Sequence, residues 1–441
     1  MLSREENDLI CRVGPETPMG KALRRYWTPA MQSSDLPEAG GDPFRLVLLG
    51  QGFVAFRGED GQVAILDEAC CHRGVSLALG HVEGCGIRCI FHGWKFAADG
   101  ELVDAPNVSE PGFMKRVRQR SYPVREAGGV IWVYLGPKEL EPPFQHHAWF
   151  DLPQENRINA YLVQEANYVQ TMEGLFDSSH LNILHIDSLK AYQKAEAEFM
   201  QAAPSVMSDT APYFEAEDTD FGFHYAALRN VGDGQDVRIA PFIAPYASIN
   251  PNGDLWMAVT PIDDTHCIYF HVWWDASKPI GTDPYRAHHL KFVGLDDETL
   301  SNFGQTYATI NNPDRPQIKN GFKQDRAAMR EGRSWSGFPA FTQDDSAVQM
   351  SAGALRDRTI ENLCNADLGI IKLYQNLRRI ALDVAAGKEP LGLHADPTQI
   401  FGVTAVVPPE GWQALVPTHK KRAKGGAAPV DYEAALAEAD A

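Results

Sequence analysis

Two short segments, each with a cysteine and a histidine, constrain this chain more than any other feature of its sequence. In the first, Cys70 lies two residues before His72. In the second, Cys89 lies three residues before His92, and Gly93 follows directly. Thiolates and imidazoles are metal ligands, so the spacing predicts two loops whose tips converge on one site. Glycines beside the ligands allow such a close approach of two backbones.

The mixture of ligands within each loop predicts a Rieske [2Fe–2S] centre, in which two Cys hold one iron and two His hold the other. A zinc site of the two-Cys, two-His type is the alternative. Such a site places both Cys on one limb and both His on the other, unlike the pattern here. Cys71 and Cys85 do not fit the spacing, and we expect them to be buried or weakly exposed free thiols.

Composition and charge exclude several classes of protein. Asp and Glu total 58 against 40 Lys and Arg, and this net charge of −18 disfavours a nucleic-acid partner. No apolar run approaches the roughly 20 residues of a membrane span. The first residues lack the apolar stretch of a signal peptide, and seven Cys without an export signal do not indicate a disulfide framework. We therefore expect a cytoplasmic enzyme with no membrane partner.

The pattern of apolar residues changes along the chain and predicts an α+β fold. Short β segments fill residues 43–136, and longer strands follow at 221–228, 238–243, 255–260 and 268–274. A short helix is predicted over 19–27 and a long amphipathic one over 366–386. The predicted divisions are helices and a β domain over 1–145, a catalytic domain over 146–418, and a polar tail over 419–441.

A second group of candidate ligands begins with His180 and His185. Five residues of regular helix turn about 500°, which leaves the two side chains about 140° apart. They can share a metal only if the helix breaks or bulges between them. Asp177, three residues before His180, lies on the same side of a helical turn.

Two histidines need one carboxylate to form the facial triad of a non-heme Fe(II) oxygenase. The downstream candidates are Asp344, Asp345, Asp357, Glu361 and Asp367. Asp367 opens the predicted helix at 366–386. The alternative for this residue is a carboxylate stabilised by the helix macrodipole.

Together these segments resemble the oxygenase component of Rieske non-heme iron aromatic-ring oxygenases, in the phthalate dioxygenase-like branch. The resemblance covers roughly residues 1–390. The segments that carry it are Thr17-Pro18-Met19-Gly20, Cys89-Ile90-Phe91-His92-Gly93-Trp94, Glu173-Gly174, Asp177-Ser178-Ser179-His180 and Asp357-Arg358-Thr359.

The resemblance implies a Rieske domain followed by a helix-grip catalytic domain, an antiparallel sheet with helices, and a head-to-tail homotrimer or a multiple of trimers. It makes His180, His185 and Asp367 the ligands of a mononuclear Fe(II). It also makes Asp177 an electron-transfer bridge between a Rieske histidine of one subunit and an iron-binding histidine of its neighbour.

The implied reaction is the reduction of O2 and its insertion into a small aromatic substrate. No dinucleotide-binding fingerprint occurs in the chain, so electrons must come from a separate NAD(P)H-dependent reductase carrying flavin and iron–sulfur groups. We expect cis-dihydroxylation, with monooxygenation such as aryl O-demethylation as the alternative. A pure Rieske electron carrier is the third reading, but it would leave the second half of the chain without a role.

The substrate is expected to bind among the strands that precede the third ligand. Its predicted aromatic lining consists of Phe221, Phe223, Tyr225, Phe242, Tyr246 and Trp256. Arg229 and Arg238 are candidate anchors for a substrate carboxylate, because a guanidinium can hold it through two hydrogen bonds. The alternative is that both arginines face solvent.

Overall fold

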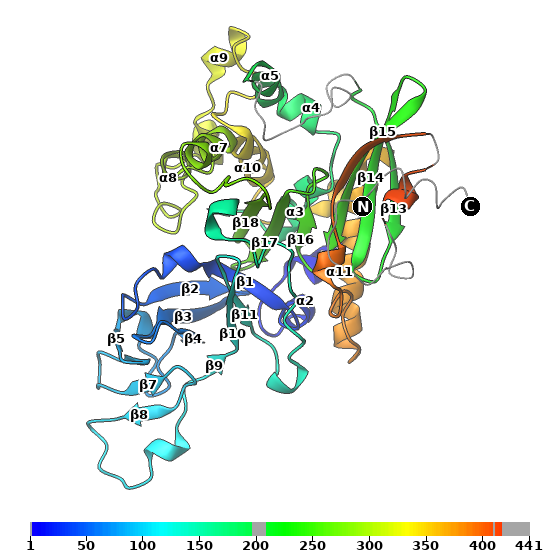
Figure 1. The fold of residues 1–441 in the computed structure, drawn as a ribbon. Helices are drawn as coiled ribbons and strands as arrows, with labels where there is room; N and C mark the ends of the chain where they lie inside the picture. Colours follow the sequence, from blue (N-terminus) through cyan, green and yellow to red (C-terminus); the bar gives the residue numbers. More distant parts are fainter. Residues whose placement is uncertain (1, 196–208, 409–410, 417–441) are drawn as a thin grey trace.

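The computed structural model describes residues 2–195, 209–408 and 411–416, and Figure 1 shows their arrangement. The polar tail predicted at 419–441 lies outside the described residues. The expected α+β fold is confirmed: small antiparallel sheets come first, and a larger antiparallel sheet with helices follows. None of the helices within the described ranges has the length and apolarity of a membrane span.

The N-terminal part contains three small antiparallel sheets. One consists of β1 (Trp27–Gln32), β11 (Val130–Tyr134) and β10 (Val124–Ala127), in that order. A second consists of β2 (Phe44–Leu48), β3 (Gln51–Arg57), β4 (Val63–Asp67) and β9 (Ser121–Tyr122). The third consists of β5 (His81–Glu83), β6 (Gly86–Arg88), β7 (Lys95–Ala97) and β8 (Leu102–Asp104). The Cys70 loop connects β4 to β5, and the Cys89 loop connects β6 to β7.

Two helices precede these sheets. In α1 (Arg4–Cys11), Ser3 accepts a hydrogen bond from the backbone of Glu6, whose side chain accepts one from the backbone of Ser3. This reciprocal cap fixes the start of the helix. In α2 (Pro18–Leu23) the helix ends earlier than predicted, because Trp27 already begins β1 and pairs with β11.

The second part is built on one eight-stranded antiparallel sheet. Its strands, in spatial order, are β12 (Arg157–Gln164), β18 (Cys267–Trp274), β17 (Leu255–Pro261), β16 (Ala247–Ile249), β15 (Gly234–Ile243), β14 (Gly222–Val231) and β13 (Tyr213–Asp218). The eighth strand, β19 (Val403–Val407), pairs with β15. Apart from β12, β13 and β19, these strands are mostly buried, consistent with the helices packed on the sheet.

The helices surround this sheet and carry the candidate ligands. They are α3 (Tyr168–Leu175), α4 (Leu181–Leu184), α5 (Ile186–Ala195), α7 (Tyr285–Val293), α8 (Asp297–Phe303), α9 (Arg326–Arg330), α10 (Phe341–Ser351) and α11 (Leu368–Ala385). Helix α11 packs against β13 and β14, whereas α10 packs against α3 and α7. In Figure 1, α4, α5 and α9 lie at one end of the molecule and β8 at the other.

A buried ionic network holds α3 in place just before the second ligand group. Arg358 is fully buried, and its Nε donates to Glu173 on α3 at 2.6 Å. The hydroxyl of Tyr374 on α11 donates to the same carboxylate at 2.7 Å. A second guanidinium nitrogen of Arg358 donates to Asn7 on α1 at 3.1 Å. The network therefore joins the N-terminal helix and α11 to the helix that leads to the site.

We expect Glu173→Gln to lower the free energy of unfolding by about 3–5 kcal/mol, because it leaves the buried guanidinium of Arg358 without its counter-charge. Urea unfolding of the full chain, followed by circular dichroism, measures this effect. Glu110→Gln is the matched control. Its ion pair with Arg116 is exposed, so a change within about 0.5 kcal/mol is expected. Equal stabilities for the two variants would contradict the structural role of Glu173.

Candidate functional site

The two predicted cluster loops have the same backbone geometry. The N–H of Cys70 donates to Val75 O, and Gly74 N–H donates back to Cys70 O at 2.8 Å. In the Cys89 loop, the N–H of Cys89 donates to Trp94 O, and Gly93 N–H donates to Cys89 O at 3.0 Å. The bonded residues are separated by five and four positions, as in the first loop. Gly74 and Gly93 have φ of 77° and 75°, a conformation that favours glycine. Both loops thus turn sharply around their cysteine.

The four predicted cluster ligands converge at the tips of these loops. The rings of His72 and His92 lie 4.5 Å apart between centroids, and Trp94 stacks on His72 at 4.2 Å. Cys70 and Cys89 are each 3% exposed. Burial, with a contribution from the nearby Cys89, raises the pKa of Cys70 to about 11. Two buried thiols beside two imidazoles are the donors that a Rieske cluster requires, so the residues fit such a cluster.

The two thiols outside the ligand spacing are free, as expected, but exposed. The expectation that Cys71 and Cys85 are buried or weakly exposed is therefore wrong. The role of Gln119 was not predicted, because no local pattern marks this residue. This buried side chain accepts from Cys71 N–H and donates to the carbonyls of Asp67 and Ala69, which secures the first loop.

The second ligand group has the break in the helix that its spacing requires. Helix α3 ends at Leu175, and α4 is a single turn. His180 is the residue before that turn and His185 the residue after it, with φ −97° and ψ 22°. Their rings therefore meet, with centroids 5.2 Å apart.

Asp345 on α10 completes a group of three possible metal ligands. Its Oδ1 lies 3.2 Å from His185 Nε2 and 3.6 Å from His180 Nε2. The ligand atoms all lie within 4.8 Å of one another, and no other such group occurs in the part of the chain that the structure describes. His185 Nε2 is buried and makes no hydrogen bond. Two imidazoles and a carboxylate are the donors of a non-heme Fe(II) site, so these residues fit mononuclear iron.

The structure brings Asp345, and not Asp367, to the two histidines. Asp367 lies at the start of α11, where its carboxylate accepts a hydrogen bond from Cys364 N–H at 2.7 Å and caps its own turn. That end of α11 packs on α3 and β14, because Gly369 allows close contact with Phe176 and Tyr225. The prediction that Asp367 is the third ligand is corrected on this geometry. Asp357 and Glu361 are also outside the group.

Two further carboxylates lie behind the histidines. Asp177 Oδ2 is 3.4 Å from His180 Nδ1, and Asp344 Oδ2 is 3.1 Å from His185 Nδ1. Each imidazole thus has its Nδ1 toward one carboxylate and its Nε2 toward Asp345. Burial by itself lowers the pKa of His185, but Asp345 and Asp344 outweigh it and raise that pKa to about 9. The site therefore favours positive charge, as a divalent cation requires.

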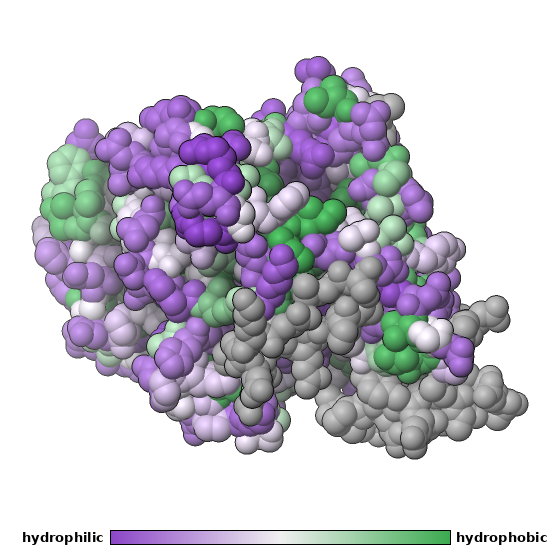
Figure 2. Space-filling model, turned by 90° about the horizontal axis from the view of Figure 1, so that it is seen from above, coloured by the Kyte–Doolittle hydropathy of each residue, from purple (hydrophilic) through white to green (hydrophobic). Residues whose placement is uncertain are grey.

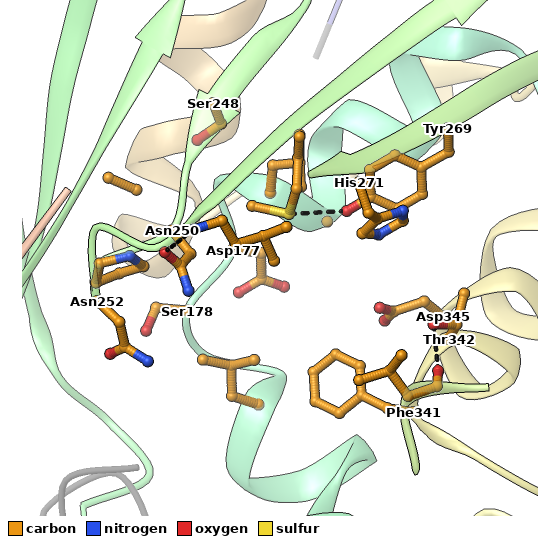
Figure 3. Close-up of a pocket in the computed structure, with 18 of the residues that line it drawn as sticks. Asp177, Ser178, Ser248, Asn250, Asn252, Tyr269, His271, Phe341, Thr342 and Asp345 are labelled. Carbon is orange, nitrogen blue, oxygen red and sulfur yellow. Dashed lines mark hydrogen bonds between the residues drawn. The ribbon is translucent and has the colours of Figure 1, made fainter. Parts of the chain in front are cut away.

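A cavity of about 200 Å³ opens beside this group (Figure 3). Asp345 and Phe341 lie on one side of it and Asn250 and Asn252 on the other, with Asp177 between. Beside the histidines the lining includes Leu181 and Phe341, and further apolar lining residues are Leu175, Leu189, Val293 and Leu295. The cavity therefore has an apolar part at the metal ligands and a polar part at the β16–β17 turn.

Arg238 lines this cavity, as predicted for a substrate anchor. Its Nε and one Nη are buried without a hydrogen-bond partner in the structure. Burial lowers the pKa of Arg238 to about 10, so the side chain stays charged at neutral pH. Arg229 lies on the same face of the sheet but is not part of the cavity wall; it is buried and donates to the Asp209 carbonyl.

Most of the predicted aromatic lining lies elsewhere. Tyr225 borders the cavity, whereas Phe223 and Phe242 are covered by Phe176. Trp256 is on the opposite face of β17 from the cavity residue Met257 and packs against Trp132. One wall of the cavity was not predicted; it consists of Tyr269, His271 and Trp273, which alternate along β18. His271 is held neutral by burial, which lowers its pKa to about 3, and its Nδ1 has no partner.

Comparisons with known proteins agree with these two sites. The Rieske [2Fe-2S] domain family matches residues 26–123, and the LigXa C-terminal domain-like family matches residues 133–434. The phthalate 4,5-dioxygenase oxygenase subunit of Pseudomonas putida is 35% identical over 429 residues, which cover 92% of this chain and 93% of the relative. The chain belongs to the Rieske non-heme iron oxygenases. It is an oxygenase subunit and an oxidoreductase, and the expected phthalate dioxygenase-like branch is confirmed.

Further relatives of this Rieske oxygenase are subunits named for different activities. The 3-chlorobenzoate-3,4-dioxygenase oxygenase subunit of Comamonas testosteroni is 36% identical, over 89% of this chain and 91% of that one. The 5,5'-dehydrodivanillate O-demethylase oxygenase subunit of Sphingobium sp. is 28% identical, over 90% and 84%. Subunits of this family use a Rieske cluster together with mononuclear Fe(II), as expected here.

Solved structures agree on the fold of this Rieske oxygenase. The structure of NdmA from Pseudomonas putida CBB5, as a QL mutant with theobromine, superimposes with a TM-score of 0.57. The match covers 83% of this chain and 93% of that one at 16% identity. It therefore supports the architecture of a Rieske domain followed by a catalytic sheet with helices.

Proposed function

We propose that this Rieske oxygenase subunit hydroxylates an aromatic carboxylate, with its mononuclear iron held by His180, His185 and Asp345. The single observation that carries the substrate class is Arg238, which lies in the wall of the cavity that the ligands border and whose Nε and one Nη are buried without a hydrogen-bond partner. Leaving buried N–H donors without acceptors is costly, and a substrate carboxylate would supply the missing acceptors. Arg229, outside the wall, is not retained as an anchor.

The cavity suits an arene with one acidic end. A substrate carboxylate at Arg238 would direct the ring toward the apolar part of the cavity, beside the metal ligands. There Leu181 and Phe341 would exclude water from the reacting carbon. The iron, when bound, supplies the centre that reduces O2. The chain's part is to orient the ring and to keep Asp345 and both imidazoles in place.

We favour cis-dihydroxylation, because the relatives with the highest identities named above are dioxygenase subunits that cover nearly all of the chain. Monooxygenation by O-demethylation is the second candidate, supported by the O-demethylase relative at 28% identity. The same metal ligands serve both outcomes. The position of the substrate over the iron decides between them.

The electrons are proposed to come from an NAD(P)H-dependent reductase and to cross between copies of this chain in a trimer. Ile90 and Phe91, beside the cluster ligand His92, are 53% and 51% exposed. A hollow of about 230 Å³, bordered by Asp177, His180 and Val348, opens on the outer side of the iron ligands. Within one copy these two regions belong to opposite ends of the fold (Figure 1). Docking of one copy's loop tips at its neighbour's hollow would bring a Rieske histidine to Asp177.

The face that would receive the neighbour carries apolar side chains. Figure 2 looks down on the end of the molecule with α4, α5 and α9, where hydrophobic residues gather near the centre of a mostly hydrophilic surface. Ile183 on α4 is 49% exposed and Val348 on α10 is 46% exposed. An apolar patch of this kind is typical of an interface with another protein surface.

A panel of aromatic acids tests the proposed activity. The iron-loaded protein is incubated with NADH, a surrogate reductase and benzoates bearing carboxyl, chloro, hydroxyl or methoxy groups. A diol product supports dihydroxylation, and a phenol with formaldehyde supports O-demethylation. If the corresponding neutral aryl amides were turned over as well as the acids, the proposed substrate class would be wrong.

Arg238→Gln should raise the KM for the aromatic acid by roughly tenfold to a hundredfold, because a hydrogen bond to a charged group is worth about 1.5–3 kcal/mol. Turnover of a neutral aryl amide should change little, since the amide does not use the charge. Arg238→Lys is the matched control and should recover part of the affinity. Steady-state kinetics with both substrates measure this. Unchanged KM for the acid in Arg238→Gln would exclude Arg238 as the anchor.

A further inference from the structure

The first turns of α10 hold His185 from three directions. Phe341 stacks on its ring, with centroids 3.7 Å apart and planes 14° from parallel. Asp344 Oδ2 lies 3.1 Å from Nδ1, and Asp345 Oδ1 lies 3.2 Å from Nε2. A three- or four-residue step along a helix returns to the same face, so residues 341, 344 and 345 can all reach one ring.

We propose that Asp344 is the positioning residue for His185. By accepting the Nδ1–H, it fixes the tautomer and the ring angle that turn the lone pair of Nε2 toward the metal. This inference rests on the proposed iron site and goes beyond it, because Asp344 would act through His185 and touch neither iron nor substrate. Carboxylates that orient metal-bound histidines in this way also make the imidazole a stronger ligand.

Burial supports a dedicated role for Asp344. The side chain of His185 is fully buried and that of Asp344 is 7% exposed, so water does not compete for their contact. A carboxylate at the start of a helix is often only a favourable partner for the helix dipole, but such residues usually face solvent. Asp344 instead lies against a buried imidazole, where an unpaired polar group would be costly.

Comparison with the other histidine sharpens the assignment. Asp177 has the same relation to His180 Nδ1, but it is 24% exposed on its side chain and borders both the cavity and the outer hollow. Asp344 borders neither of these spaces. Asp177 is therefore available to a neighbouring copy or a substrate, whereas Asp344 borders neither space and contacts the side chains of His185 and Ser336.

The charge of Asp344 has a second consequence for the iron. A buried negative charge close to a metal ligand stabilises the more positive oxidation state. Removing that charge while keeping an oxygen acceptor should therefore raise the reduction potential of the mononuclear iron. A residue with a purely structural role would leave this potential unchanged once the site is loaded.

The experiment compares Asp344→Ala and Asp344→Asn with wild type in the full chain, with Asp367→Asn as the control for loss of a nearby carboxylate. Fe(II) affinity is measured anaerobically by chelator competition, and site geometry by the visible spectrum of the Co(II)-substituted protein. The Rieske absorption and circular dichroism report on folding. The iron potential is measured by electron paramagnetic resonance at set potentials.

We expect Asp344→Ala to bind Fe(II) about 10–100-fold more weakly and to alter the Co(II) spectrum. Asp344→Asn keeps an acceptor oxygen, so it should recover most of the affinity but show a higher iron potential. Wild-type affinity, Co(II) spectrum and potential in both variants would overturn the inference. Should wild type bind no Fe(II), or Asp345→Ala bind it as wild type does, the proposed iron site itself fails, and this inference with it.

Discussion

Asp345→Ala is expected to lose the mononuclear iron and all measurable turnover while keeping the Rieske absorption. The substitution removes one of the three ligand atoms that lie within 4.8 Å of one another, and two imidazoles alone do not form a facial triad. The cluster ligands Cys70 and Cys89 lie in a separate hydrophobic cluster of the N-terminal part, so their spectrum should not change. Iron content per chain, visible absorption and turnover of an aromatic acid measure the three effects.

Asp367→Ala is the matched control for this result. It removes the carboxylate that the sequence favoured, which in the structure caps the turn before α11. Loss of such a cap costs stability of about 0.5–2 kcal/mol and leaves the metal in place. If Asp367→Ala lost the iron and Asp345→Ala retained it, the assignment of the third ligand would be reversed.

With both metal sites loaded, Asp177→Asn is expected to slow electron transfer to the mononuclear iron by about tenfold to a hundredfold. Asp177 Oδ1 accepts from Ser179 N–H at 2.8 Å, and an asparagine oxygen can keep that bond and the turn. The amide nitrogen would then face His180 Nδ1, where the carboxylate oxygen now lies at 3.4 Å. The amide N–H of the asparagine and the Nδ1–H of His180 would then both be donors, so the hydrogen bond from the imidazole to residue 177 would be lost.

Rapid mixing of the pre-reduced variant with O2 and an aromatic acid measures this effect. We expect the absorption of the reduced cluster to persist, whereas the Asp367→Asn control should reoxidise at the wild-type rate. Iron content and oligomeric size must match wild type for the comparison to hold. Reoxidation of Asp177→Asn at the wild-type rate, with normal product yield, would show that Asp177 is not the bridge.

The two pairs of metal-binding histidines differ in how far the sequence could predict their surroundings. Each cluster loop is a local turn, in which a cysteine, a histidine and a glycine lie within five residues, so spacing predicts the geometry directly. The break between His180 and His185 could also be predicted, because a regular helix cannot bring both rings to one metal. Short-range geometry was sufficient in each case.

The third ligand depended on contacts that the local pattern does not contain. Asp345 and Asp367 are both acidic residues in the first turns of helices after a long separation from His185. What decides between them is that α10, and not α11, lies against His185, through Phe341 and Asp345. The predicted aromatic lining was wrong for related reasons. Trp256 lies on the opposite face of β17 from the cavity residues Leu255 and Met257, because successive side chains of a strand alternate. Phe223 lies on the correct face of the sheet but is covered by Phe176.

A mixed oligomer tests most directly whether the cluster of one copy serves the iron ligands of its neighbour. Cys89→Ser should lack the cluster, and Asp345→Ala should lack the mononuclear iron, so each should be inactive alone. In a head-to-tail trimer that contains both variants, about one third of the junctions join an intact cluster to an intact iron site. We predict that differently tagged, co-purified mixed oligomers regain about that share of wild-type product formation. Mixed oligomers of confirmed composition that stay inactive would contradict transfer between copies.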